Sequence, residues 1–235
     1  MERQGPGSRE MTLKALSFVK NPNNSAKAAD LGCGTGGQTM TLAEAFPGSI
    51  VGVDISSDFI KVFNVNTEEA GIATRVKGIV GSMDNLPFHK AEFDLIWSEG
   101  AIDNMGFEKG LTYWRIFLKE NGYISVTCPS WFTDKHPAEV EKFWADAGSR
   151  LDSIEHNIGV MKASGYSFIA AFVLPEVCWV DNYFIPRTKA ENVYFQKYPE
   201  NRTIKEYIDC SRYELDLYTK YKQHYGYVFY IGRKT

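Results

Sequence analysis

The sequence predicts an α/β domain in which helices cover both faces of a doubly wound, mainly parallel sheet. A short apolar run over 27–31 leads into a glycine-dense turn and then a helical pattern, which is typical of a strand, a tight turn and a helix. Further apolar runs alternate with helical patterns along the chain. The 235 residues, 44% of them hydrophobic and 23% charged, suit one such domain with added segments, which we expect to span 1–235.

The predicted elements follow in a regular order. Strands are predicted over 27–31, 49–54, 75–80, 93–97, 123–128, 166–174 and 225–231, which makes a seven-stranded sheet. Ser8 is expected to cap a helix that reaches about Val19, and Ser56 or Ser57 a helix that ends near Gly71. Other helices are predicted from the glycine turn to Phe46, over 106–118 and over 153–163.

Two segments exceed what a minimal fold of this kind needs. They are the stretches 129–152 and 175–224, which follow the fifth and sixth strands, and each contains a helical pattern. Insertions of this length in a compact domain usually build a lid or an interface. We therefore expect both to be helical and to lie on the substrate side of the sheet.

The glycine turn fits two ligand patterns. Gly32, Gly34 and Gly37 satisfy the dinucleotide fingerprint G-x-G-x-x-G, whereas Gly32, Gly34 and Gly36 follow Asp30 in the D-x-G-x-G-x-G pattern of S-adenosylmethionine (SAM) binders. Asp54 closes the second strand, where a carboxylate binds a ribose diol that NAD and SAM both carry. The two motifs indicate a ligand that contains adenosine but leave its identity open.

Three local features favour SAM. Asp30 precedes the glycines, where a carboxylate would meet the ammonium of a methionine moiety and would repel a pyrophosphate. The third strand runs into Met83 for an adenine ring face and Asp84 for the exocyclic amine. The fourth strand runs into Ser98 and Glu99.

These ordered motifs, over about residues 25–130, resemble the class I SAM-dependent methyltransferases, in particular the small-molecule branch around the ubiquinone and menaquinone methyltransferases. The resemblance implies a Rossmann-like fold, SAM as cofactor and transfer of its methyl group to a small-molecule substrate. An NAD(P)-dependent oxidoreductase using the same turn and a non-catalytic SAM-binding module stay open as alternatives. The residues implied for the cofactor are Gln4, Asp30, Gly32, Cys33, Gly34, Gly36, Asp54, Ile55, Ser82, Met83, Asp84, Ser98 and Glu99.

Candidates for the chemistry lie after the fourth strand and in the insertions. Glu99 is a candidate base, because in this family the methyl group points toward the end of that strand, and His136 is a candidate proton carrier. Trp131, Tyr183 and Phe184 open the insertions, and such rings suit a flat, apolar or cationic acceptor. We expect them to share a substrate cavity, with packing of the insertions onto the sheet as the alternative.

Composition narrows the remaining possibilities. The net charge is −3 and the charges are interleaved, so no basic face for a nucleic acid is apparent. The four cysteines are scattered without a C-x-x-C pair, which predicts neither a metal site nor a disulfide framework. No apolar run approaches a membrane span and the N-terminus lacks a signal-peptide core, so we expect a cytoplasmic protein. The oligomeric state is open, and a homodimer is possible.

Overall fold

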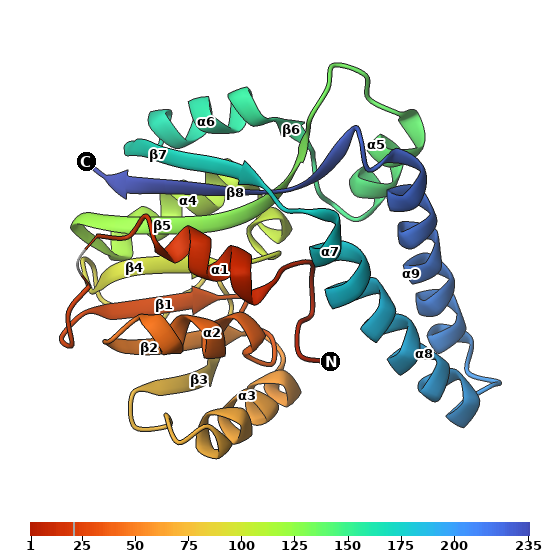
Figure 1. Ribbon diagram of the computed structural model, residues 1–235, viewed down its shortest axis with the longest axis horizontal. Helices are drawn as coiled ribbons and strands as arrows, with labels where there is room; N and C mark the ends of the chain where they lie inside the picture. Colours follow the sequence, from red (N-terminus) through yellow and green to blue (C-terminus); the bar gives the residue numbers. More distant parts are fainter. Residues whose placement is uncertain (21) are drawn as a thin grey trace.

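The computed structural model describes residues 1–20 and 22–235, and a twisted sheet lies at its centre (Figure 1). In the described residues the sheet has eight strands in the order β3-β2-β1-β4-β5-β8-β7, with β6 paired to β5. The strands are β1 (Lys27–Leu31), β2 (Ser49–Asp54), β3 (Val76–Val80), β4 (Phe93–Ser98), β5 (Leu118–Trp131), β6 (Asp152–Ser153), β7 (Tyr166–Val173) and β8 (Tyr225–Lys234). The predicted fold class is confirmed, and β6 is a two-residue addition to the seven predicted strands.

Strand direction explains where a ligand can bind. Neighbouring strands among β1 to β5 pair in parallel, whereas β8 runs antiparallel between β5 and β7. The carboxyl ends of β1 to β4 therefore meet at one edge of the sheet, which is where open α/β sheets bind ligands.

Helices cover both faces, as a doubly wound sheet requires. On one face, α1 (Arg9–Leu16), α2 (Gly37–Ala45) and α3 (Ser57–Glu69) bury apolar side chains in one core cluster (Figure 1). On the other face, α4 (Phe107–Trp114) and α6 (Ile154–Ala163) pack into a second cluster. Burial of these apolar stripes against the sheet stabilises both layers.

The predicted caps at Ser8 and Ser56 are confirmed. The Ser8 hydroxyl accepts a hydrogen bond from the backbone N–H of Met11 at 3.1 Å, and Ser56 accepts one from Phe59 at 3.3 Å. Each satisfies an N–H group that the first helical turn leaves without a partner. The first helix ends earlier than expected, at Leu16.

The fifth strand is longer than the sequence predicts. Leu118, expected to end a helix, already pairs with Phe93 in β5, so that helix ends at Trp114 and a 3₁₀ turn over Arg115–Phe117 follows. At the other end, Trp131 pairs with Tyr225 of β8. The first insertion therefore leaves the sheet after Trp131 and carries α5 (Ala138–Asp146).

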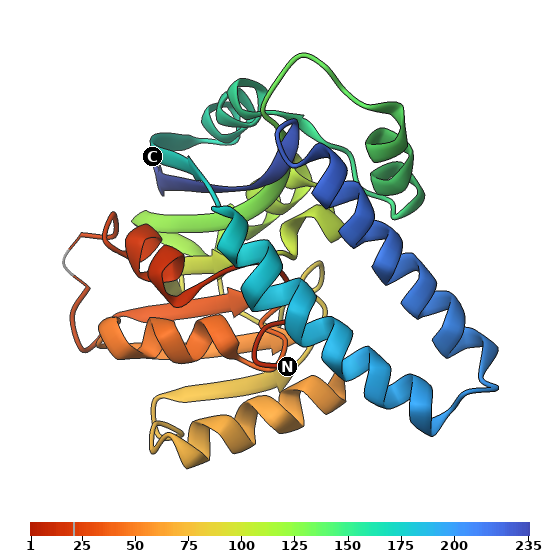
Figure 2. The same cartoon turned by 45° about the vertical axis from the view of Figure 1, so that its right-hand side comes forward.

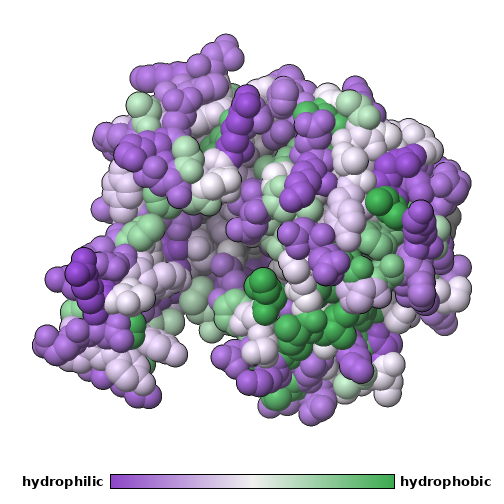
Figure 3. All heavy atoms as spheres, turned by 180° about the vertical axis from the view of Figure 1, so that it is seen from behind, coloured by the Kyte–Doolittle hydropathy of each residue, from purple (hydrophilic) through white to green (hydrophobic). Residues whose placement is uncertain are grey.

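The second insertion forms a helical arm. It consists of α7 (Glu176–Trp179), a π-helical turn over Val180–Phe184, α8 (Ile185–Lys197) and α9 (Arg202–Tyr221). Figure 2 shows that α8 leads away from the sheet and that α9 returns toward it, and we call this pair of helices the α8–α9 arm. Figure 3 shows, from behind, a cleft between this arm and the rest of the molecule.

Candidate cofactor site

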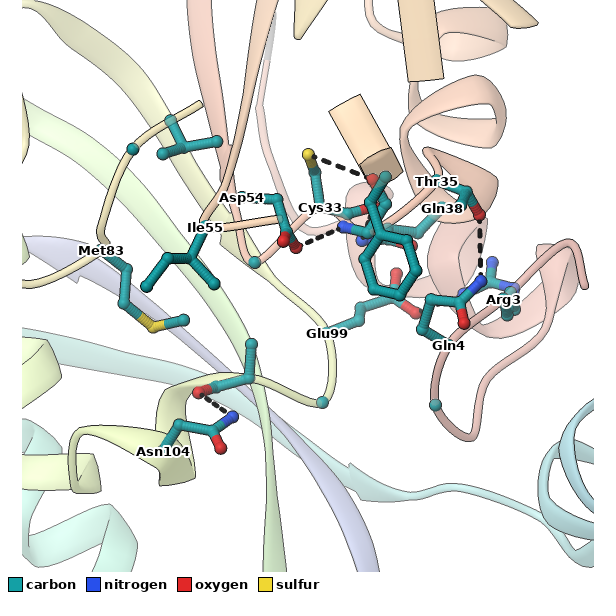
Figure 4. A pocket seen from close by; sticks show the side chains of 18 of the residues that line it. Arg3, Gln4, Cys33, Thr35, Gln38, Asp54, Ile55, Met83, Glu99 and Asn104 are labelled. Atoms are coloured by element: carbon teal, nitrogen blue, oxygen red, sulfur yellow. Dashed lines mark hydrogen bonds and ion pairs between the residues drawn. The ribbon is translucent and has the colours of Figure 1, made fainter. Parts of the chain in front are cut away.

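A cavity of about 390 Å³ lies at the carboxyl ends of the parallel strands (Figure 4). Its volume is within the range of ligand pockets. Its walls come from the glycine turn after β1, from the ends of β2, β3 and β4 and from the N-terminal segment, residues 2–6. This is the position predicted for the cofactor.

The turn after β1 requires glycine for two reasons. Gly32 and Gly34 have φ of +74° and +54°, in the left-handed region that favours glycine. A Cβ atom on Gly32 would lie 2.3 Å from the Cβ of Ala101, and one on Gly34 would lie 3.0 Å from the Cγ of Gln4. Gly36 lies behind the turn against Phe63 and does not line the cavity.

Asp54 connects the end of β2 to the glycine turn. Its carboxylate accepts hydrogen bonds from the backbone N–H of Gly34 and from that of Ser56, each at 2.9 Å (Figure 4). Asp54 lines the cavity, and a carboxylate has further lone pairs with which to accept from a ribose diol. The residue therefore fits its predicted role and also orients the turn.

An apolar slot lies at one end of the cavity. The side chains of Ile55 and Met83 point toward each other in Figure 4, and Ile55 is 77% exposed. Trp114 donates from its indole nitrogen to the carbonyl of Met83 at 2.9 Å, which holds this loop in place. Ser82 donates to the carboxylate of Asp84 at the rim. The two side chains give this end of the cavity an apolar surface with polar groups at its edge.

Asp30 does not line the cavity, contrary to expectation. Its carboxylate is fully buried and accepts hydrogen bonds from Thr39 and, at 3.5 Å, from the amide of Gln38. Burial raises the pKa of Asp30 to about 7. Gln38, which donates to Asp30, lines the cavity in its place.

Of the two predicted cofactor residues Ser98 and Cys33, only Cys33 lines the cavity. Ser98 is buried at the end of β4 and donates to the carbonyl of Leu31 at 2.7 Å, so it joins two strands beneath the cavity instead of lining it. Cys33 does line the cavity, and burial raises the pKa of its thiol, which keeps it uncharged.

Glu99 anchors the N-terminal segment. One carboxylate oxygen accepts from Arg3 at 2.8 Å, and the other accepts from the indole of Trp97 at 2.9 Å and from Thr12 at 2.7 Å. Its side chain is 2% exposed. Because both oxygens are engaged, the structure gives Glu99 a structural role at the cavity wall in place of the expected role as a base.

The N-terminal segment lies against the glycine turn. Gln4 lines the cavity and donates from its amide to the hydroxyl of Thr35 at 3.2 Å (Figure 4). Thr35 in turn donates to the carbonyl of Glu2 at 3.2 Å. These contacts hold residues 2–6 along one wall of the cavity.

His136 and Trp131 belong to a different cavity, of about 400 Å³. Their rings stack at 4.4 Å between centroids, and His136 lies 3.5 Å from the carboxylate of Glu141. Trp131 also packs against Tyr225, its neighbour across the sheet. Neither residue lines the cofactor cavity, so the expected proton carrier is separated from the glycine turn.

Tyr183 and Phe184 do not join Trp131 in one cavity, and this expectation is corrected. Phe184 is buried against Trp179 and Tyr218, with centroids 5.8 and 5.6 Å apart. The Tyr183 hydroxyl accepts from Arg187 at 2.6 Å. These two rings pack within the molecule, which was the alternative to a shared substrate cavity, because the π-helical turn directs them into the base of the arm.

Some cavity residues were not predicted. Phe59, Asn104 and Met105 line the cavity, and so do Arg3 and Gln38. The position of Gln38 at the cavity could have been predicted from the local sequence, since Gln38 directly follows the glycine turn in the chain. The position of Arg3 could not have been predicted in this way, because it depends on a partner 96 residues away.

A parallel sheet that turns antiparallel at β8, with a cavity over the glycine turn, gives this domain the fold of the class I SAM-dependent methyltransferases. Residues 28–122 match the family model described as a methyltransferase domain. The predicted resemblance, and SAM as the cofactor, are confirmed. The oxidoreductase alternative finds no support.

Curated relatives agree over the same part of the chain. The chain is 32% identical over 90 residues to a demethylmenaquinone methyltransferase of Lactiplantibacillus plantarum, which is 37% of this chain and 36% of that protein. It is 29% identical over 99 residues to a probable chloroplastic tocopherol O-methyltransferase of Oryza sativa subsp. japonica, 40% of this chain and 27% of that one. The chain therefore spans about a third of the length of these relatives.

Solved structures share the whole fold. A SAM-dependent methyltransferase from Geobacter sulfurreducens, solved with S-adenosylhomocysteine, superposes with a TM-score of 0.86 at 18% identity, over 100% of this chain and 94% of that one. A 4+2 cyclase has a TM-score of 0.77 at 19% identity, over 96% of this chain and 81% of that one. Since the second protein is named for a different reaction, the fold alone does not decide the chemistry.

Among residues 1–20 and 22–235, no helix is both long enough and apolar enough to cross a membrane. In the same residues no group of three or more side chains is arranged to hold a metal ion. The thiols of Cys33, Cys128 and Cys178 are buried, that of Cys210 is exposed, and all are free.

Proposed function

We propose that this protein transfers the methyl group of SAM to a small-molecule acceptor. The observation that carries the proposal is the cavity itself, in which a glycine turn, the Asp54 carboxylate and the Ile55–Met83 slot follow one another along one wall. When bound, SAM supplies an activated methyl group on a sulfonium. The protein's own contribution is to bind, orient and shield the reactants.

The residues divide this work among them. Asp54 is expected to accept from the ribose hydroxyls, and Ile55 with Met83 to hold the adenine. Gly32 and Gly34 allow close approach of the backbone, and the N-terminal segment, held by the Arg3–Glu99 pair, excludes water from that side. Arg3, Asp54 and Glu99 line this cavity and are all engaged in hydrogen bonds, which favours an acceptor that needs orientation more than a strong base.

The acceptor class is part of the proposal. The relatives named above act, by their names, on demethylmenaquinone and tocopherol, which are small molecules. The interleaved surface charges and the free cysteines support a small-molecule acceptor instead of a nucleic acid and a reducing, cytoplasmic location. We further propose that 1–235 acts as one domain and that both insertions border the acceptor.

Calorimetry with S-adenosylhomocysteine and with NAD tests the cofactor part. We expect S-adenosylhomocysteine to bind and NAD not to bind; heat from NAD alone would overturn the proposal. A screen of lysate supplied with protein and methyl-labelled SAM, read by mass spectrometry, tests the reaction. A labelled small molecule that needs intact Asp54 supports an enzyme, whereas binding of S-adenosylhomocysteine without any labelled product would favour the non-catalytic SAM-binding module.

A further inference from the structure

The α8–α9 arm contains a second cavity of about 390 Å³, which shares no lining residue with the cofactor cavity. Its lining residues come from both helices of the arm and from the first residue of the chain: Met1, Arg187, Ala190, Glu191, Tyr194, Thr203, Ile204, Tyr207 and Ile208. The walls are mainly apolar and aromatic, so buried charged groups among them need an explanation.

The positive charge of Arg187 is balanced by one of two nearby carboxylates. Its guanidinium donates to the carboxylate of Glu214, to the hydroxyl of Tyr183 at 2.6 Å and to the carbonyl of Ser211 at 2.7 Å. Arg187 and Glu214 therefore form a partly buried, hydrogen-bonded ion pair in which the positive charge is already balanced.

Glu191 is the second carboxylate, and it lacks a full partner. One oxygen accepts from Ser211 and lies 3.4 Å from the Nε of Arg187, which is too poorly aligned to form a hydrogen bond. The other oxygen is buried without any hydrogen-bond partner, and the residue is only 6% exposed. One guanidinium thus faces two carboxylates, of which Glu191 is buried and Glu214 is half-buried, and an uncompensated buried charge is strongly unfavourable.

The surroundings supply no second cation for Glu191. Over residues 1–20 and 22–235, Arg187 is the one cationic group within ion-pair distance of Glu191, and the Met1 amino group forms no ion pair with it. Burial raises the pKa of Glu214, and the neighbouring Arg187 acts in the opposite direction. Tyr194 and Tyr207 contribute rings that are 61% and 63% exposed.

We propose that this cavity binds a protonated organic amine with an apolar body. An ammonium N–H would donate to the free oxygen of Glu191 and supply the missing positive charge. The rings of Tyr194 and Tyr207 attract a cation through their faces, and Ile204 and Ile208 offer apolar surface to the rest of the ligand. The site lies beside Met1, whose carbonyl accepts from Gln4 of the cofactor cavity at 3.4 Å.

Calorimetry with three ligands of similar shape tests the charge preference. The full chain is titrated at pH 7.5 with 2-phenylethylamine, 2-phenylethanol and phenylacetate. We expect the amine to bind at least about tenfold more tightly than the alcohol, a difference of about 1.4 kcal/mol, and phenylacetate to give no heat. Equal binding of amine and alcohol overturns the proposal.

Glu191→Gln separates a ligand site from structural packing. This change leaves the balanced Arg187–Glu214 pair, so we expect the melting temperature to hold or rise while the preference for the amine is lost. Glu206→Gln is the matched control, because Glu206 lies on the same arm, is exposed and pairs with Arg202 outside the cavity. A Glu191→Gln protein that melts earlier and still prefers the amine would mean that Glu191 is only a structural partner of Arg187.

A second variant tests the site at an exposed residue, where a substitution should leave the fold intact. Tyr207→Leu removes an exposed ring, and we expect it to weaken amine binding several-fold without changing the melting temperature. Retention of full amine affinity by this variant would contradict the proposed site. Binding of S-adenosylhomocysteine should be unchanged in each of these variants, so this test fails or succeeds independently of the proposed methyl transfer.

Discussion

The guanidinium of Arg3 lies 2.8 Å from the carboxylate of Glu99, and both side chains are buried although 96 residues separate them in the chain. Trp97 and Thr12 complete the hydrogen bonds of Glu99. This pair fastens the N-terminal segment to the end of β4 and so connects the start of the chain to the wall of the cofactor cavity.

Arg3→Ala should loosen that segment. It leaves Glu99 without its counter-charge, and breaking a buried pair costs about 3–5 kcal/mol of folding free energy when the charge stays buried. We expect the free energy of unfolding, measured with urea, to fall by no more than this amount. We also expect the affinity for S-adenosylhomocysteine to drop at least about tenfold, which equals about 1.4 kcal/mol. Arg9→Ala is the control, since Arg9 forms an exposed pair with Glu44. If both variants bind alike, the segment does not contribute to the site.

Asp54→Ala should weaken binding of S-adenosylhomocysteine by about 1.5–3 kcal/mol, the value of a hydrogen bond to a charged group. Part of the loss comes from the freed Gly34 N–H, which Asp54 now holds. Asp58→Ala, at an exposed carboxylate paired with Lys61, should bind normally. Calorimetry of the two variants under one set of conditions decides the matter, and normal affinity in Asp54→Ala would mean that the ribose is held elsewhere.

Gly34→Val should lower both stability and cofactor binding. Its φ of +54° strains any β-branched residue, and the new side chain meets Gln4 beside the cavity. Gly71→Val separates the two effects, because Gly71 has φ of +68° but no neighbour within 4 Å of a new Cβ atom. We expect thermal unfolding to shift in both variants and affinity for S-adenosylhomocysteine to fall only in Gly34→Val. A fall in both would show that strain alone explains the effect.

Asp30→Asn should change the pH dependence of stability. The pKa of Asp30 is raised from 3.8 to about 7 in the folded protein, so its contribution is fully present below pH 4 and is lost as the pH rises through about 7. The stability of the variant relative to the unchanged protein should therefore increase from pH 4 to 7, by up to about 4 kcal/mol, and level off above pH 8. Urea unfolding across this range measures the difference, and a flat difference would show that Asp30 titrates normally.

Local patterns in the sequence were sufficient to predict several of the residues that line the cofactor cavity. The glycine turn, the acid that closes β2 and the helix caps at Ser8 and Ser56 each depend on residues within a few positions of one another. The strand–turn–helix order then sets their place in space, because the carboxyl ends of parallel strands meet at one edge. The positions of Asp54, Met83 and Gly34 along the chain were therefore enough to predict that they line the cavity.

The tertiary structure alone decided which polar and aromatic side chains reach that cavity. Asp30 is adjacent to the turn in sequence but points into the core, and Glu99 is occupied by Arg3. Trp131 lies at the end of a strand because β8 extends to pair with it. One carboxylate oxygen of Glu191 lacks a hydrogen-bond partner, because the terminal guanidinium nitrogens of Arg187 bond to Glu214, Tyr183 and Ser211 instead. Each outcome depends on contacts between segments far apart in the chain, which a local pattern does not encode.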